Sequence, residues 1–353
     1  MKRILSALLF SIAPLMAQDY KIAIVGLIHS HVWGHLQSVL HGSPAKLVGI
    51  AEANPDLVAE AKKMGAADSL FFNDYKKMLD QVRPDIVWAF VENNRHLEIV
   101  EACAPHRINV MFEKPLASTY KDAVAIRELA QKDGILIMTN YQMVWWPANY
   151  AAKAAADAGE IGRVWRLHGI VGHGGPGSEG PRNRYFFAWL TDPVKNGAGA
   201  LMDFGCYNAL WSLWYLGKPD TVYAEVNHLR PERFPKVEDN STMTLGYKNG
   251  VGIFEGSWDL PRSFQDLEVY GLGGSLYMDR SKVEERKGRG LAKELPLPPL
   301  PADRADPVAY MVSCLRQHKP LEGLVATDIN VSVIQIIDAA KQSVRKSCAV
   351  KLQ

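Results

Sequence analysis

The residues best suited to acid–base chemistry lie in two short stretches of this 353-residue chain. Lys114 stands in FEKPLA (112–117), and Asp203 and Tyr207 stand in DFGCY (203–207). A partly desolvated lysine has a lowered pKa, which suits it to transfer a proton or to polarise a carbonyl. A tyrosine, with an ordinary pKa of about 10, is a poor base at neutral pH unless a cation such as Lys114 lowers that pKa. We therefore expect Lys114 and Tyr207 to act on a hydroxyl or a carbonyl, although Tyr207 could instead pack in a core.

A glycine near the N-terminus points to a dinucleotide site. In IAIVGLIHSHVWGH, which begins at Ile22, Gly26 closes the first apolar run. A tight turn from a strand into a helix, with the backbone close to a ligand, requires glycine at that place. The G-x-G-x-x-G pattern then departs, because Ile28 and His31 occupy the places of its second and third glycines. Ile28 adds a Cβ where a phosphate normally approaches, so we expect an altered phosphate-binding loop.

Other groups in this loop could bind the phosphates. The pyrophosphate of a dinucleotide binds backbone N–H groups at a helix N-terminus. Those groups could still serve in a wider loop, with Ser30, His29 and His31 as side-chain donors. The alternative is that the histidines are surface residues and that phosphate binding is weakened. His29, His31 and His35 could also hold a metal ion, but no cysteine or carboxylate lies beside them in the sequence, so we expect no metal.

Glu52 ends the second apolar run, at about the distance from Gly26 where an acidic residue binds the ribose diol. A carboxylate there accepts hydrogen bonds from the 2′-hydroxyl and repels a 2′-phosphate. No arginine follows it closely. The sequence therefore favours NAD over NADP.

The order of elements predicts an α/β fold. Residues 21–140 alternate strand-like and helix-like runs, which predicts a doubly wound parallel sheet. From about residue 150, alternating runs predict a second α+β domain with a mainly antiparallel, open sheet. We divide the chain into a Rossmann domain at 18–140 and a substrate-binding and oligomerisation domain at 141–353.

Smaller signals mark individual elements. Asn54, Asn73 and Thr119 are expected to cap helices. The glycine-rich stretch GHGGPGSEGPRNRYFFAWL, which begins at Gly172, is expected to be a loop and a candidate lid. The four cysteines have no metal-like spacing and are expected to be buried free thiols.

The N-terminal segment and the charge bear on location and partners. Lys2 and Arg3 precede an apolar run that ends before Ala17, which predicts a secretory signal at 1–17 and a periplasmic or secreted protein. The net charge of +2 and the lack of a basic run argue against nucleic acid or an anionic membrane as the main partner. No later segment is long and apolar enough to span a bilayer.

A series of motifs resembles one family in nearly all of the mature chain. These motifs are, in order, AEANPD, VENNRH, FEKPLA, NYQMVWWP, GEIGRV, GAGALMDFGCYNALW and LEVYGLGGSL. The chain resembles the glucose-fructose oxidoreductase / inositol dehydrogenase / rhizopine-catabolism (Gfo/Idh/MocA) family. The resemblance implies a nicotinamide cofactor, a small carbohydrate substrate and a homodimer or homotetramer.

The resemblance also implies roles for individual residues. Lys114 would approach the substrate hydroxyl and the nicotinamide, Asp203 would orient the substrate, and Tyr207 stands where the family commonly has an acid–base histidine. Gln142 stands where relatives often have an arginine, which points to a neutral sugar or polyol. Further contacts to the cofactor are expected from Asn93, His96 and Glu113, and further contacts to the substrate from Tyr141, Trp146 and Arg184.

Three functions remain open from the sequence. The first is an NAD-dependent oxidoreductase that acts on a neutral sugar, glycoside or cyclitol. The second is a redox-neutral glycosidase or lyase with tightly bound NAD and a transient 3-keto sugar, as in some secreted relatives. The third is a non-catalytic sugar-binding protein on a dehydrogenase scaffold, because Ile28, His31 and Tyr207 depart from the family pattern.

Overall fold

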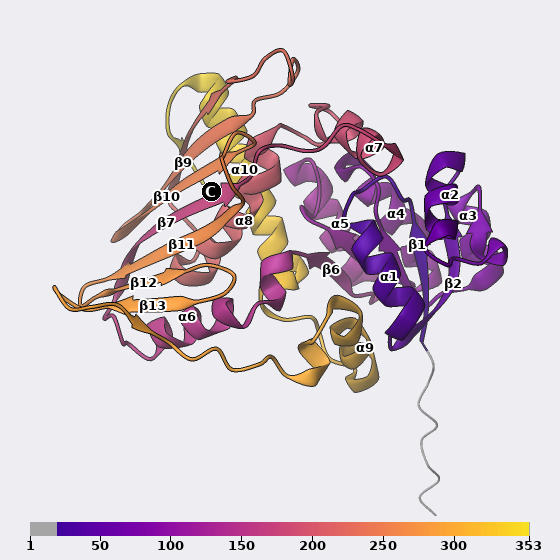
Figure 1. The fold of residues 1–353 in the computed structure, drawn as a ribbon, viewed down its shortest axis with the longest axis horizontal. Helices are drawn as coiled ribbons and strands as arrows, with labels where there is room; N and C mark the ends of the chain where they lie inside the picture. Colours follow the sequence, from indigo (N-terminus) through magenta and orange to yellow (C-terminus); the bar gives the residue numbers. More distant parts are fainter. Residues whose placement is uncertain (1–19, 353) are drawn as a thin grey trace, which may run out of the picture.

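The computed structural model describes residues 20–352, so the signal segment predicted at 1–17 lies outside the described residues. In the described part, two sheets lie next to each other, each with its own helices (Figure 1). None of the helices in this part is both long and apolar enough to cross a membrane.

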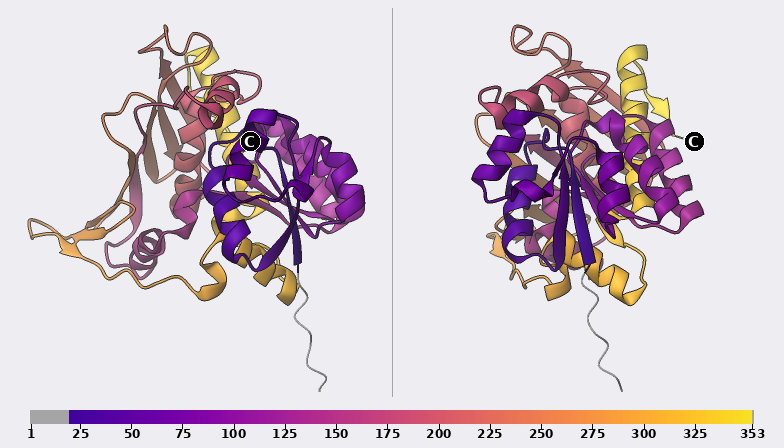
Figure 2. Two further views of the ribbon diagram at one scale, coloured as in Figure 1. Left: turned by 45° about the vertical axis from the view of Figure 1, so that its right-hand side comes forward. Right: turned by 90° about the vertical axis from the view of Figure 1, so that its right-hand side faces the viewer.

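The first sheet is the predicted doubly wound parallel sheet. Its strands are β1 (Tyr20–Val25), β2 (Ala45–Ala51), β3 (Phe71–Phe72), β4 (Ile86–Ala89), β5 (Asn109–Glu113) and β6 (Ile137–Asn140). All pairs are parallel, in the order β3-β2-β1-β4-β5-β6. Helices flank both sides of the sheet (Figure 2): α1 (Val32–Gly42), α2 (Pro55–Lys63), α3 (Tyr75–Val82), α4 (His96–Cys103) and α5 (Tyr120–Asp133). The strand order reverses between β1 and β4, and ligands bind beyond the carboxyl ends of the strands at such a point.

Side-chain caps explain where these helices begin. Asn54 accepts a hydrogen bond from the Asp56 amide at 3.1 Å, as predicted. Thr119 accepts one from the Asp122 amide, also at 3.1 Å. The cap predicted at Asn73 is wrong by one residue, because the carboxylate of Asp74 accepts from the first free amides of α3.

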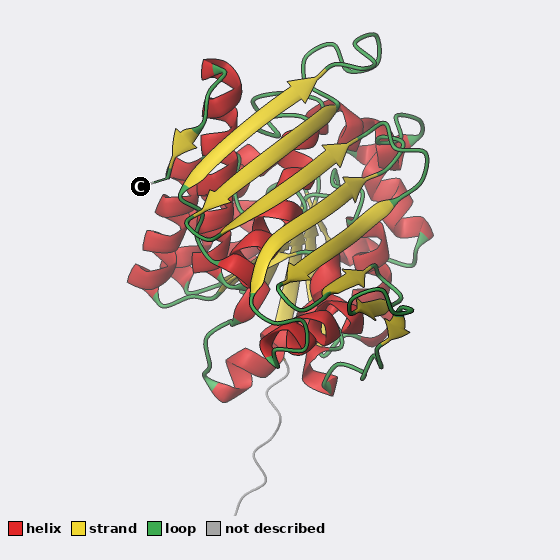
Figure 3. Ribbon diagram, turned by 90° about the vertical axis from the view of Figure 1, so that its left-hand side faces the viewer, coloured by secondary structure: helices red, strands yellow, loops and turns green. Residues whose placement is uncertain are grey.

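The second sheet is mainly antiparallel, as predicted. Its strands are β7 (Val164–Gly172), β8 (Thr221–Asn227), β9 (Asn240–Tyr247), β10 (Gly250–Ser257), β11 (Phe264–Gly271), β12 (Ser275–Met278), β13 (Val283–Arg286), β14 (Lys293–Glu294) and β15 (Val350–Lys351). Their order is β14-β13-β12-β11-β7-β10-β9-β8-β15, and within the described part of this second sheet only β7 and β10 pair in parallel. Figure 3 shows one face of this sheet free of helices. Helices α6 (Pro147–Asp157) and α8 (Ala200–Leu216) pack against the other face.

The glycine-rich stretch is not a loop throughout, which corrects the expectation. Its second half forms α7 (Pro181–Leu190), with Pro181 at the first helical position. Proline suits that position because it has no N–H to leave unpaired. The glycines before Pro181 hide the helix from a pattern search.

One long helix joins the two parts of the molecule. Helix α10 (Thr327–Lys346) packs against α5 of the first domain and against α8 and β8 of the second (Figure 1). Its contact face is apolar, with Val333, Ile334 and Ile337 fully buried. Helix α9 (Pro307–Gln317) precedes it.

The four cysteines are free thiols, as predicted, but they are not all buried. Cys103, Cys206 and Cys314 are buried, whereas Cys348 is exposed in the turn after α10.

Candidate active site between the two domains

A cavity of about 260 Å³ lies where the first domain meets the second, beside the end of β5. Its lining comes from both domains. The residues are His29, Ser30, His31, Lys114, Gln142, His173, Gly175, Pro176, Gly177, Asn183, Phe186, Leu190, Asp203, Phe204, Tyr207 and Gln265. The structure therefore brings Lys114 to the same cavity wall as Asp203, 89 residues away in the chain, together with Tyr207 and the variant loop.

Lys114 and Asp203 form the polar centre of this wall. The ammonium of Lys114 donates to the main-chain oxygen of Asp203 at 2.8 Å and also to its carboxylate. The second carboxylate oxygen accepts from the indole N–H of Trp258 at 2.8 Å. Asp203 is therefore held on both sides, and one of the three ammonium N–H groups of Lys114 stays available to a ligand. The Lys114–Pro115 peptide bond is cis.

The lowered pKa expected for Lys114 is wrong in direction in this structure. Burial alone would lower that pKa, but the charge of Asp203 outweighs burial and raises the pKa above its ordinary value. The same pairing lowers the pKa of Asp203, which burial alone would raise. Lys114 is therefore a permanently charged hydrogen-bond donor rather than a base.

Tyr207 lies beside this pair and is itself almost fully buried. Its ring packs edge-on against Tyr141 at 5.2 Å between centroids, and the ammonium of Lys114 lies 5.0 Å from its ring centre. Burial raises the pKa of Tyr207, and the charge of Lys114 offsets only part of that rise. Tyr207 is thus a neutral phenol that both lines the cavity and packs in the core.

The loop after β1 has the geometry that requires glycine. Gly26 has φ +81°, and a Cβ at that position would lie 2.7 Å from Cγ1 of Val91 and 2.9 Å from the carbonyl oxygen of Phe90. The amide of Gly26 donates to the Ala51 carbonyl at 2.8 Å, which ties the loop to the end of β2. The backbone can therefore approach a ligand closely at Gly26, although Ile28 follows.

A second cavity of about 160 Å³ lies on the other side of this loop, next to Glu52. It is lined by Val25, Gly26, Ile28, Ala51, Glu52, Ala53, Asn73, Tyr75, Val91 and Arg95. The carboxylate of Glu52 accepts from the amides of Leu27 and Asn54, both at 2.8 Å. Each oxygen keeps a lone pair for a ribose hydroxyl. The residues present fit the adenosine half of NAD.

Glu113 forms a buried network with two histidines. One carboxylate oxygen lies 2.8 Å from Nδ1 of His31. The other lies 3.2 Å from Nε2 of His35 and accepts from the Asn140 amide at 2.6 Å. Burial alone would raise the pKa of Glu113, but the two histidines hold it well below the ordinary value. An ionised, fully hydrogen-bonded carboxylate therefore lies under the variant loop.

His29, His31 and Glu113 are also spaced like possible metal ligands, since one donor atom of each lies within 4.8 Å of the others. The histidines have no carboxylate beside them in the sequence, but the fold brings Glu113 to them from β5. The same atoms are already engaged within the protein, because Glu113 has three partners and Nδ1 of His29 accepts from the His31 amide at 3.2 Å. The geometry is that of a hydrogen-bonded network, and we do not assign metal ligands here.

Helix α7 lies across the variant loop and α2. The indole N–H of Trp189 donates to the Ile28 carbonyl at 3.3 Å. Arg182 donates to Glu60 at 2.8 Å, and Arg184 pairs with Asp56. Arg184, expected to bind substrate, therefore points to α2 and does not line the cavity. Helix α7 is therefore fixed to the variant loop on one side and to α2 on the other.

Several other predicted contacts lie outside both cavities. Tyr141 and Trp146 are buried, Tyr141 behind Tyr207 and Trp146 against Arg280. His96 stacks on Phe112 at 4.2 Å, and its Nδ1 lies 3.0 Å from the Leu116 carbonyl oxygen. Asn93 donates to Asn196 at 2.8 Å and so ties the two domains together. These four residues contact other protein groups and do not line either cavity.

Sequence patterns did not single out Trp258 and Gln265, which contact or line the site. Contacts between distant elements place these two residues there. His173 and Arg95 also line the cavities; His173 stands in the glycine-rich stretch expected to reach over the site, and Arg95 stands in the motif VENNRH.

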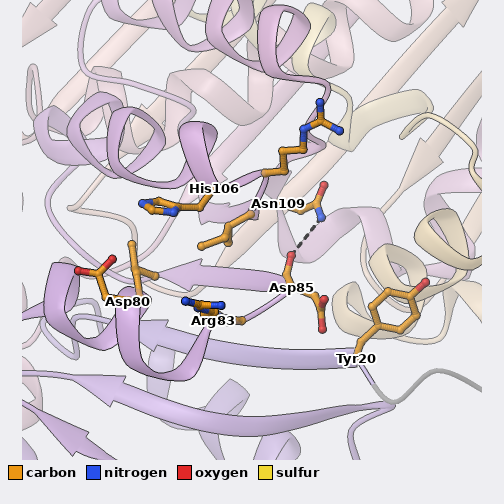
Figure 4. Close-up of a pocket in the computed structure, with 10 residues that line it drawn as sticks. Tyr20, Asp80, Arg83, Asp85, His106 and Asn109 are labelled. Atoms are coloured by element: carbon orange, nitrogen blue, oxygen red, sulfur yellow. Dashed lines mark hydrogen bonds between the residues drawn. The ribbon is translucent and has the colours of Figure 1, made fainter.

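A larger cavity, of about 620 Å³, lies at the opposite edge of the first sheet (Figure 4). Tyr20, Asp85 and Asn109 stand there at the amino ends of the strands, with Arg83 and His106 beside them. Asn109 donates to the Asp85 carbonyl at 3.0 Å. Ligands of such sheets bind at the carboxyl edge, so this cavity is not the candidate active site.

Two family models match the chain. The model of the oxidoreductase family with an NAD-binding Rossmann fold matches residues 20–141, and that of the GFO/IDH/MocA C-terminal domain matches residues 150–277. Levoglucosan dehydrogenase of Pseudarthrobacter phenanthrenivorans is 28% identical over 298 residues, which cover 74% of this chain and 72% of that protein. Myo-inositol 2-dehydrogenase of Thermotoga maritima is 23% identical over 251 residues, 69% of this chain and 71% of that protein.

Solved structures share the fold. Aldose-aldose oxidoreductase from Caulobacter crescentus, complexed with glycerol, superimposes with a TM-score of 0.80 at 20% identity, covering 95% of this chain and 100% of that one. Levoglucosan dehydrogenase in complex with NADH and levoglucosan gives a TM-score of 0.78 at 21% identity, covering 95% and 99%. Both likenesses extend over the two domains together.

Proposed function

Because the chain belongs to the GFO/IDH/MocA family of oxidoreductases, with an NAD-binding Rossmann domain, we propose that it oxidises or reduces a neutral sugar, glycoside or cyclitol with NAD. The observation that carries the proposal is the buried Lys114–Asp203 pair in the wall of a cavity at the carboxyl edge of the NAD-binding sheet. Names of relatives, such as levoglucosan dehydrogenase and myo-inositol 2-dehydrogenase, support a polyhydroxylated substrate.

The substrate class follows from the chemistry of the cavity wall. Gln142, Asn183 and Gln265 offer uncharged amides, which match sugar hydroxyls. The one cation in the lining, Lys114, is already neutralised by Asp203. A negatively charged group on the substrate would therefore find no unpaired lysine or arginine in the lining, and a neutral substrate is favoured.

The chain's own residues perform three tasks in this proposal. The free N–H of Lys114 donates to the reacting oxygen and stabilises negative charge that develops on it. Asp203 fixes the direction of that ammonium, and Trp258 fixes Asp203. Glu52 binds the ribose hydroxyls and disfavours a 2′-phosphate. NAD, when bound, supplies hydride transfer at the nicotinamide C4.

The test is a substrate screen with purified protein, NAD⁺ and a panel of neutral sugars, anhydrosugars, glycosides and cyclitols, followed by NADH absorbance. We expect turnover of at least one neutral substrate and a loss of about 10²-fold or more in Lys114→Met, because one stabilising donor contributes several kcal/mol. Lys153→Met, which removes an exposed ion pair on α6, is the control. Absence of turnover together with absence of nucleotide binding would favour a sugar-binding protein.

A second candidate function rests on α7. We propose, as the alternative, a glycosidase or lyase that keeps its NAD bound and passes through a 3-keto sugar. Oxidation at C3 acidifies the C2–H, which permits loss of the C1 substituent before reduction restores the ring. The contacts of α7 with Ile28, Asp56 and Glu60 support retention of a cofactor over many turnovers. Protein denatured after purification should then release about one NAD(H) per chain, and aglycone release should proceed without free NADH.

Two further properties belong to the proposal. The segment at 1–17 directs the chain to the periplasm or outside the cell, which N-terminal sequencing of the exported protein would test by a cut near Ala17. The helix-free face of the second sheet mediates a homodimer or homotetramer (Figure 3). Light scattering after gel filtration measures that mass, and a monomer would contradict it.

A further inference from the structure

Three histidines line the candidate active-site cavity: His29, His31 and His173. In each of them the Nδ1 atom has a partner within the protein. A neutral imidazole carries one proton, so the partner at Nδ1 decides whether Nε2 donates or accepts. The three rings can therefore be told apart.

His29 and His173 are donors toward the cavity. Nδ1 of His29 accepts from the His31 amide at 3.2 Å, and Nδ1 of His173 accepts from the Gly175 amide at 3.0 Å. Burial lowers the pKa of both histidines, so both rings are neutral at pH 7. With Nδ1 unprotonated, Nε2 carries the proton in each.

His31 has the opposite arrangement. Its Nδ1 lies 2.8 Å from the carboxylate of Glu113, which is only 1% exposed. An ionised carboxylate accepts and cannot donate, so Nδ1 of His31 must carry the proton. The Nε2 atom then has an open lone pair. His31 is the histidine of the three that can take a proton from a ligand.

The other polar groups of the wall are unsuited to that task. Lys114 is protonated because it pairs with Asp203. Both carboxylate oxygens of Asp203 are occupied, one by Lys114 and one by Trp258. Tyr207, at the family's histidine position, is a neutral phenol whose pKa burial raises. An alcohol oxidised in this cavity needs another group to accept its hydroxyl proton.

We propose that His31 is the acid–base catalytic residue of this enzyme and that Glu113 is the residue that positions it. The proposal rests on the proposed oxidoreductase function. In oxidation, the substrate O–H bond breaks and its proton passes to Nε2 of His31. The C–H bond of the carbon that bears this oxygen breaks as the C=O bond forms, and NAD, when bound, would accept the hydride. In reduction, the protonated His31 returns that proton to the new alkoxide.

The surroundings of His31 suit a carboxylate-oriented base. Glu113 comes from β5, and its other oxygen is fixed by Asn140 from β6 and by His35 from α1. A base whose far nitrogen is held by a buried carboxylate keeps one tautomer and one ring orientation, and its protonated form is stabilised. His29, from the same loop, packs at 4.6 Å between ring centres. Lys114, His173, Asp203 and Tyr207 are the other titratable groups that line the cavity.

The first test compares His31→Gln with His41→Gln at saturating NAD and saturating substrate. His41 is exposed in the last turn of α1 and does not line the cavity, so it is the matched control. We expect kcat to fall by about 10²–10⁴-fold in His31→Gln, the usual contribution of a general base, and to stay unchanged in His41→Gln. The acidic limb of the kcat profile should vanish in His31→Gln, and added imidazole should restore part of the activity of His31→Ala.

The second test does not depend on turnover. In protein labelled with ¹⁵N-histidine, NMR should show the Nδ1–H tautomer for His31 and the Nε2–H tautomer for His29 and His173. Glu113→Gln should disturb the His31 tautomer and lower kcat by about 10-fold or more with little change in KM for substrate.

Three outcomes would overturn the proposal while leaving the oxidoreductase function intact. One is wild-type turnover that His31→Gln reduces only through weaker nucleotide binding, with kcat unchanged at saturation. Another is an Nε2–H tautomer at His31. The third is activity that a chelator abolishes and a divalent metal restores, which would make the His31–Glu113 group a metal site.

Discussion

The ammonium of Lys114 and the carboxylate of Asp203 form an ion pair between the two domains, and both side chains are more than nine-tenths buried. The ion pair therefore has two structural effects. It aims one N–H at the substrate cavity, and it links the first sheet to α8. Removing either partner leaves an uncompensated charge at a site with little exposure to solvent.

Asp203→Asn is expected to lower the free energy of unfolding by about 3–5 kcal/mol, because the buried ammonium loses its counter-charge. Urea unfolding followed by circular dichroism measures the change. Asp157→Asn, which removes the pair with Lys153 at the exposed Asp157 carboxylate on α6, should cost no more than about 0.5 kcal/mol. Equal effects of the two substitutions would show that the buried pair has no special weight.

The pH dependence of that difference has a defined sign. The pKa of Asp203 is lowered from 3.8 in the folded state, so its contribution is complete above that value and is lost as the pH falls further. The pKa of Lys114 is raised from 10.5, so its contribution is complete below that value and is lost as the pH rises through the folded-state value. The stability gap between wild type and Asp203→Asn should be flat between about pH 5 and 9. A gap that changes within this window would contradict the assignment.

Gly26→Ala is expected to destabilise the protein by about 2 kcal/mol or more and to abolish tight nucleotide binding. The new Cβ would meet Val91 and the Phe90 carbonyl, and φ +81° strains any residue with a side chain. Gly34→Ala on α1 is the matched control, since nothing lies within 4 Å of its Cβ position. That change should raise stability by up to about 1 kcal/mol. Thermal unfolding with and without NAD distinguishes the two.

Glu52→Gln tests the basis of nucleotide preference. The amide keeps an oxygen for the Leu27 or Asn54 amide but removes the charge that repels a 2′-phosphate. We expect the ratio of kcat/KM for NADP to that for NAD to rise by about 10-fold or more. Steady-state kinetics with both nucleotides provide the ratio, and an unchanged ratio would place nucleotide selection elsewhere.

The double variant Arg182→Ala/Arg184→Ala should release nucleotide several-fold faster than wild type. These arginines tie α7 to Glu60 and Asp56 on α2, and Trp189 of α7 contacts the loop proposed to bind the cofactor. Stopped-flow fluorescence of bound NADH against excess NAD⁺ measures release. Arg262→Ala, which removes a surface pair with Asp266 in the second domain, should leave the rate unchanged. Equal rates in all three proteins would count against α7 as a cover.

The sequence predicted what depends on local pattern. The alternation of strands and helices, the turn at Gly26, the caps at Asn54 and Thr119, and the position of Glu52 at the end of β2 all follow from neighbouring residues. Helix α7 was not predicted because the glycines and the proline before it are typical of loops. Pro181, the next proline, begins the helix.

What the sequence could not predict depends on contacts between distant residues. The direction of the Lys114 pKa shift reverses once Asp203 lies against it. The role of His31 is visible only when β5 brings Glu113 under the loop. Trp258, 55 residues from Asp203, has no motif to announce it.

Helix α10 limits how the two domains can move relative to each other. It packs on α5 of the first domain and on α8 of the second, so the two domains share one helix. A hinge motion between the two domains would have to break its apolar contacts and the Lys114–Asp203 pair together. Two-domain enzymes often exclude water by closing their domains around the substrate. Such a closure would cost both sets of contacts here. We therefore expect the movement that admits a ligand in α7 and in the glycine-rich turn before it, whose Gly175 and Gly177 line the cavity.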